Sequence, residues 1–120
     1  MTAMVYKDFT LADLLHAYEE IVMKQDRSFL IDDIEAYNLQ YKIHHAIVDE
    51  LRARDQRERL SVFLERREPF LRMCAASDTY SLNPERARKY MQTVADYRFD
   101  PYRGEAASRL GAWSRGFTPR

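Results

Sequence analysis

Residues 68–77 read Glu-Pro-Phe-Leu-Arg-Met-Cys-Ala-Ala-Ser, and residues 100–108 read Asp-Pro-Tyr-Arg-Gly-Glu-Ala-Ala-Ser. Both stretches contain an acid followed by proline and then the phrase Arg-x-x-Ala-Ala-Ser. Proline is favoured at the first position of a helix, where its missing N–H costs nothing. A helical phrase that returns after about thirty residues is typical of stacked helix pairs, because each pair buries its apolar face only against a neighbour. The repeat therefore predicts an all-α helical-repeat fold.

Composition narrows the class of protein further. A chain of 120 residues is long enough for one core, so we expect a single domain spanning residues 1–120. Its three glycines and four prolines supply too few turns for a β-sandwich or barrel. The single cysteine, Cys74, cannot form an internal disulfide, and the first residues lack the features of a secretion signal. No apolar run approaches the roughly twenty residues of a membrane span. We therefore expect a cytoplasmic protein that does not enter a membrane.

Helix start signals divide the chain into six segments. Thr10 and Asp13 have the spacing of a capping box, and Asn83 followed by Pro84 is the clearest N-cap in the chain. The six expected helices begin near residues 10, 33, 55, 69, 84 and 101. Their short connections predict three antiparallel pairs. In the second helix, about residues 33–54, apolar side chains fill more than half the circumference, which predicts burial on two sides.

An ordered series of residues resembles a small bacterial HEAT-like family. The series comprises Gln25, Tyr37-Asn38, Asp55-Gln56-Arg57, Arg72 with Ala75-Ala76, Pro84-Glu85, Ala87-Arg88, Ala95-Asp96, Gly104-Glu105-Ala106, Leu110, Gly116-Phe117 and Pro119. The family is the domain of unknown function number two-thousand-nineteen, common in alpha-proteobacteria. The resemblance implies a short right-handed α-solenoid of HEAT/armadillo-like helix pairs and carries no activity or catalytic residues.

The resemblance also implies two local features. Arg54 departs from the pattern of the family, in which a glycine is expected before Asp-Gln-Arg, so the turn there should differ in shape. In HEAT-like repeats the arginine of Arg-x-x-Ala-Ala tends to pair with an acid, which assigns Arg72 and Arg103 a structural role.

The sequence contains no group of residues that indicates a catalytic site. His44 and His45 are adjacent on one helix, and His16 lies on another, so they do not converge as metal ligands do. Cys74 stands among apolar residues, which favours packing over reactivity. Glycine-rich phosphate loops and the common hydrolase motifs are absent. We expect no enzyme activity, no metal and no cofactor.

Charge is distributed unevenly along the chain. The formal net charge is zero, which argues against a general polyanion binder. Residues 1–51 nevertheless carry ten acids and four bases, so this part has a net charge of −6 and the remainder +6. The basic part is almost wholly arginine.

Arginines in two equivalent loops are the main functional candidates. Arg66, Arg67 and Arg98 precede the repeated helices, and equivalent loops of stacked units project from one edge of a solenoid. We expect these three to form one exposed edge that binds a partner, although they would equally serve to balance the acidic first half. Should that edge not bind, the second candidate surface is the face lined by Arg103, Arg109 and Trp113.

Two functions remain open. The first is a protein–protein interaction or regulatory module with an unknown partner, for which the arginines favour an acidic one. The second is nucleic-acid binding through the arginine-rich half. Zero net charge and the acidic first half favour the protein partner. Tyr80, Tyr97 and Tyr102, at expected helix ends and loops, are further candidates for a recognition surface.

Overall fold

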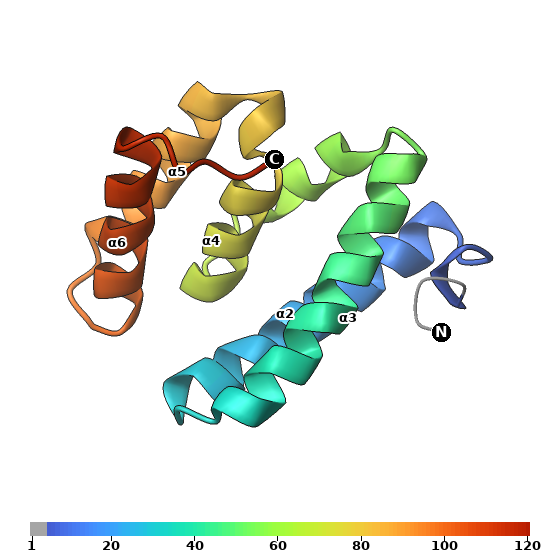
Figure 1. Cartoon of the computed structure of the whole chain (residues 1–120), viewed down its shortest axis with the longest axis horizontal. Coiled ribbons are helices and arrows are strands. Elements are labelled where there is room, and N and C mark those ends of the chain that lie inside the picture. The colour runs from blue at the N-terminus through green and yellow to red at the C-terminus, as the bar shows by residue number, and fades with distance from the viewer. Residues whose placement is uncertain (1–4) are drawn as a thin grey trace. The chain divides into compact units, whose positions relative to one another are not determined.

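The computed structural model describes residues 5–120, which form helices and no strand (Figure 1). All six segments predicted to be helical are helical, so the predicted all-α architecture of packed helices is confirmed. The chain divides into two compact units, one ending at Arg59 and the other running from Leu60 to Arg120. The single-domain organisation remains a prediction.

The first unit is a helical hairpin. Helix α2, Leu11–Leu30, packs along α3, Ile34–Ala53 (Figure 1). The predicted capping box is present: the Asp13 N–H donates to Thr10 Oγ1 over 3.0 Å, and the Thr10 N–H donates to the Asp13 carboxylate. At the start of α3, the Asp33 carboxylate accepts from the Ala36 N–H over 3.1 Å. Local side-chain caps thus fix where both helices begin.

Helix α3 is less covered than its sequence predicts. Its buried side chains form a single stripe in its second half, made of His44, Ile47, Val48 and Leu51. In its first half, Ile34 is 65% exposed and Leu39 is 59% exposed. The prediction that α3 is buried on two sides is therefore wrong, because much of its wide apolar arc lies on the surface.

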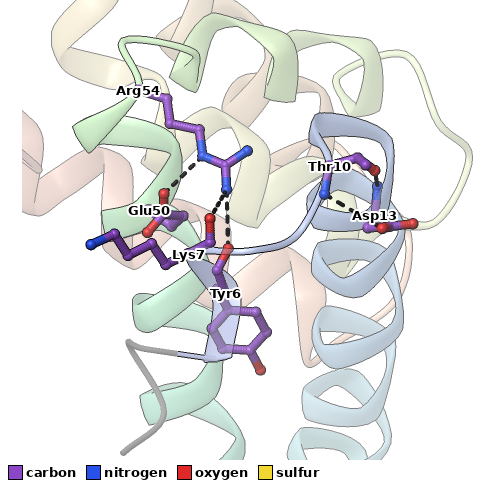
Figure 2. Close-up of polar contacts among 6 residues, drawn as sticks. All are labelled: Tyr6, Lys7, Thr10, Asp13, Glu50 and Arg54. Carbon is purple, nitrogen blue, oxygen red and sulfur yellow. Dashed lines mark hydrogen bonds and ion pairs between the residues drawn. The ribbon is translucent and has the colours of Figure 1, made fainter.

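Arg54 is the C-cap residue of α3, and its side chain connects this helix to the backbone of Tyr6 and Lys7 (Figure 2). Its Nε donates to Glu50 Oε2 over 2.8 Å, and its Nη2 donates to the carbonyls of Tyr6 and Lys7, each over 3.0 Å. The φ of Arg54 is −93°, whereas the left-handed φ of +56° falls on the next residue, Asp55. A glycine is therefore not required at position 54, and the arginine there makes contacts that glycine cannot.

The turn after α3 leads into a 3₁₀ helix. This helix, η1, spans Arg57–Phe63 and replaces the third predicted α-helix. Leu60 and Phe63 are buried, as is Leu64 directly after them. The apolar residues of this segment are buried as the sequence predicts, but the helix is a 3₁₀ helix, which is wound more tightly than an α-helix.

Three α-helices build the second unit: α4, Pro69–Asp78, α5, Pro84–Ala95, and α6, Tyr102–Ser114. Helix α5 packs against both α4 and α6, and a short 3₁₀ helix, η2 at Tyr80–Leu82, connects α4 to α5. The Asn83 side chain accepts from the Arg86 N–H over 3.1 Å, as its N-cap position predicts.

The repeated alanines do not occupy equivalent environments. Ala75 and Ala76 of α4 are fully buried, and so is Ala106 of α6. Ala107, the counterpart of Ala76, is exposed. The repeated phrase therefore places two small residues against a neighbour in α4 but only one in α6.

Candidate interaction site

Arg66 lies in the connection before α4 and forms an ion pair with Glu68. Its Nε donates to Glu68 Oε1 over 3.2 Å, and its Nη2 donates to Oε2 over 2.9 Å. These hydrogen bonds are the main reason that the pKa of Glu68 lies below its ordinary value, and the nearby positive charges of Arg66 and Arg67 lower it further. Arg66 therefore neutralises an acid two residues away, and its guanidinium group already binds a carboxylate within the chain.

Side chains from elsewhere in the unit hold the backbone of residues 66 and 67. Arg72 Nη2 donates to the carbonyl of Arg66 over 2.6 Å, and its Nη1 donates to Thr93 Oγ1 over 3.1 Å. The Tyr97 hydroxyl donates to the carbonyl of Arg67 over 3.0 Å. Arg72 is structural, as predicted, but these bonds go to neutral oxygens of α5 and of the connection rather than to an acid.

Arg67 and Arg98 remain exposed, and we call these two residues the basic edge. Neither guanidinium makes a hydrogen bond or ion pair with any residue between 5 and 120. Their segments precede α4 and α6, as predicted, and the bond from Tyr97 to the Arg67 carbonyl ties these segments together. Phe99, beside Arg98, is 70% exposed. The basic edge thus combines two unpaired cations with an exposed aromatic ring.

The second candidate surface, Arg103, Arg109 and Trp113, does not form one exposed face. Arg103 pairs with Asp100 over 3.1 Å. Arg109 donates to Glu105 over 2.9 Å and to Ser77 Oγ over 3.0 Å, which links α6 to α4. These contacts indicate that both arginines stabilise the second unit.

Trp113 belongs to the core of the second unit. Only 5% of it is exposed, and its ring centroid lies 4.7 Å from that of Tyr80, which is also buried. The Tyr80 hydroxyl accepts from Arg88 over 2.9 Å. Neither aromatic ring is available to a partner, so the suggested recognition roles of Trp113 and Tyr80 have no support in the structure.

Sequence reasoning missed the role of Tyr97. It placed this residue among candidates for contact with a partner, whereas its hydroxyl is used inside the unit. In the sequence, Tyr97 is notable only for its position next to Arg98. That position does not indicate which carbonyl accepts a hydrogen bond from the tyrosine hydroxyl.

The histidines and the cysteine of the described residues differ in burial. His44 is buried between α2 and α3, where its Nδ1 lies 2.7 Å from Gln25 Oε1, while His45 is exposed. Cys74 is 4% exposed. Between residues 5 and 120, no three His, Cys, Asp or Glu side chains converge as metal ligands would.

Within residues 5–120, no helix is both long enough and apolar enough to cross a bilayer.

Comparisons with known proteins find a family and a solved structure that resemble the chain. The family described as "Domain of unknown function (DUF2019)" matches residues 12–113. The crystal structure of the protein RPA1889 from Rhodopseudomonas palustris CGA009 is similar, with a TM-score of 0.87 and 28% sequence identity over 96% of this chain and 98% of that one. No curated protein matches the chain.

Proposed function

Because this chain belongs to the family of domains of unknown function called DUF2019, we propose its role from its own surface. The protein is a small, non-catalytic, HEAT-like helical module that acts in the cytoplasm by binding a protein partner. The basic edge receives an acidic segment of that partner. The observation that carries this proposal is that Arg67 and Arg98 are exposed and unpaired within residues 5–120, on segments tied together by Tyr97.

The geometry of the basic edge suits carboxylates. A guanidinium presents a planar fork of donors that matches a carboxylate and binds it bidentately. Arg66 already illustrates this chemistry within the chain through its two bonds to Glu68. Hydrogen bonds to the carbonyls of Arg66 and Arg67 already hold the backbone of this loop. Binding a partner therefore costs less conformational entropy, which leaves a tighter affinity for the same contacts.

A direct binding measurement tests the proposal. We would label a flexible glutamate-rich peptide with a fluorophore and follow its anisotropy as the protein is added, using the wild type and the variant Arg67→Gln/Arg98→Gln. The expected result is a loss of affinity of at least about tenfold, or about 1.4 kcal/mol. The matched control, Lys89→Gln/Arg115→Gln, removes the same charge from exposed positions of the same unit and should stay within about twofold.

Two outcomes would contradict the proposal. Equal losses in the basic-edge variant and the control would indicate that only overall charge matters. Tighter binding to a single-stranded oligonucleotide than to the peptide at equal salt, with affinity falling steeply as salt is raised, would favour nucleic acid as the partner instead. Circular dichroism of each variant checks that helix content is retained.

A further inference from the structure

The turn between α2 and α3 exposes a group of large aliphatic side chains. Residues 30–35 read Leu-Ile-Asp-Asp-Ile-Glu, and we call this stretch the acidic tip. Leu30 is 50% exposed, Ile31 is 74% exposed and Ile34 is 65% exposed. A single exposed aliphatic residue is ordinary, but three within five residues form a patch that water solvates poorly.

The charges around this patch indicate what covers it. Asp32, Asp33 and Glu35 are exposed, and none of them forms an ion pair with a described residue. Asp33 uses a carboxylate oxygen to cap α3. An occupant of the patch must therefore bring apolar surface together with positive charge.

The basic edge has this complementary character. It presents the unpaired guanidinium groups of Arg67 and Arg98, and Phe99, the next residue after Arg98 in the chain, is 70% exposed. The acidic tip offers aliphatic surface with carboxylates, and the basic edge offers an aromatic ring with arginines. Opposite charges at such a contact fix its register and speed the encounter, while the apolar groups supply the area removed from water.

We propose that the partner of the basic edge is a second copy of this chain, which inserts its acidic tip there. This inference rests on the proposed function, because it names the partner of the same edge. The two surfaces are different, so the contact is heterologous: each copy uses its basic edge to hold one neighbour and its acidic tip to reach another. Copies therefore associate head to tail, and the association weakens as salt screens the charges.

Complementary variants provide the test. The edge variant is Arg67→Glu/Arg98→Glu, and the tip variant is Ile31→Ser/Glu35→Lys, which leaves the Asp33 cap in place. Sedimentation velocity at increasing concentration should show association of the wild type at about 50 mM salt and at least about tenfold weaker association at about 300 mM. Each variant alone should sediment as a monomer, because one of its two surfaces is reversed.

The decisive sample is the equimolar mixture of the two variants. The tip variant retains an intact basic edge and the edge variant retains an intact acidic tip, so the mixture should form a one-to-one dimer and nothing larger. A mixture that stays monomeric, or variants that associate like the wild type, would overturn the inference. Lys89→Glu/Arg115→Glu serves as the charge control and should associate as the wild type does.

This experiment separates two kinds of failure. If the wild type remains a monomer at about 0.5 mM and low salt while the basic edge still binds the glutamate-rich peptide, only the second copy is excluded as the partner. If the peptide does not bind either, the proposed function fails as well. Urea unfolding of each variant verifies that a lost association does not come from a lost fold.

Discussion

Replacing Arg54 with alanine should remove three polar contacts at once. The pair with Glu50 is partly buried, with side-chain exposures of 27% and 16%, so solvent screens it less than a surface pair. The two bonds to the carbonyls of Tyr6 and Lys7 are charge-assisted but lie near the surface. Assigning about 0.5–1 kcal/mol to each of the three contacts gives an expected loss of about 2 kcal/mol in the free energy of unfolding.

Arg52→Ala is the matched control. Arg52 belongs to the same helix end, and its contact with Asp49 is 3.4 Å long between side chains that are 48% and 62% exposed. Such a pair contributes about 0.5 kcal/mol or less. Both substitutions remove one arginine and introduce the same good helix former, so the difference between the variants isolates the contacts of Arg54.

Urea denaturation measures the loss, and amide hydrogen exchange shows where it arises. In Arg54→Ala, exchange should accelerate at Phe9, whose N–H donates to the carbonyl of Tyr6 over 3.1 Å. Arg54→Lys keeps a cation that reaches Glu50 but not all three acceptors, so its stability should be intermediate. Equal losses for Arg54→Ala and Arg52→Ala, or unchanged exchange at Phe9, would refute the reasoning.

Three further predictions concern the interior and the effect of pH. Ala75→Leu should destabilise by about 1–3 kcal/mol through overpacking, whereas Ala107→Leu on the exposed face of α6 should change the melting temperature little. Gln25→Leu should cost about 1–3 kcal/mol in urea unfolding, because it removes the buried partner of His44 Nδ1. Since the pKa of Glu68 is lowered in the folded protein, its ion pair with Arg66 stabilises the fold at neutral pH, and this contribution is lost as the pH falls through the lowered pKa. Glu68→Gln should therefore be less stable than the wild type at neutral pH. A stability difference between the two that persists unchanged in acid would contradict this assignment.

Much of the fold could be predicted from the sequence because helix starts are encoded locally. Thr10, Asp33 and Asn83 each cap a helix with their own side chain, and a cap depends on residues only three positions away. The winding of the third segment could not be predicted in the same way. Its buried Leu60 and Phe63 are three residues apart, a spacing that both an α-helix and a 3₁₀ helix place on one face.

Burial of repeated or apolar residues was harder to predict. Ala76 and Ala107 occupy the same position of the repeated phrase, yet Ala76 is buried and Ala107 is exposed. Burial depends on where the neighbouring helices lie, which the phrase itself does not encode. Likewise, the apolar arc of α3 includes Ile34 and Leu39, which a count of apolar positions assigns to a core and the structure leaves exposed.

The candidate site was predictable only in outline. The equivalence of the two loops predicts that Arg67 and Arg98 belong together, and the Tyr97 hydrogen bond joins their segments. The pairing of Arg66 with Glu68 was missed because residues two apart do not face each other on a helix, so helical spacing rules do not consider them. Contacts between segments thirty residues apart, such as that of Tyr97, depend on tertiary packing.

The bonds from Arg72 and Tyr97 end on main-chain carbonyls, and that choice of acceptor has an evolutionary consequence. Every amino acid carries the same carbonyl, so the loop keeps its support when the side chain at position 67 is exchanged. The side chain at position 67 can therefore change without a compensating change in the helices. The helices and residue 67 are free to diverge at different rates, because the support of the loop does not depend on which side chain stands at that position.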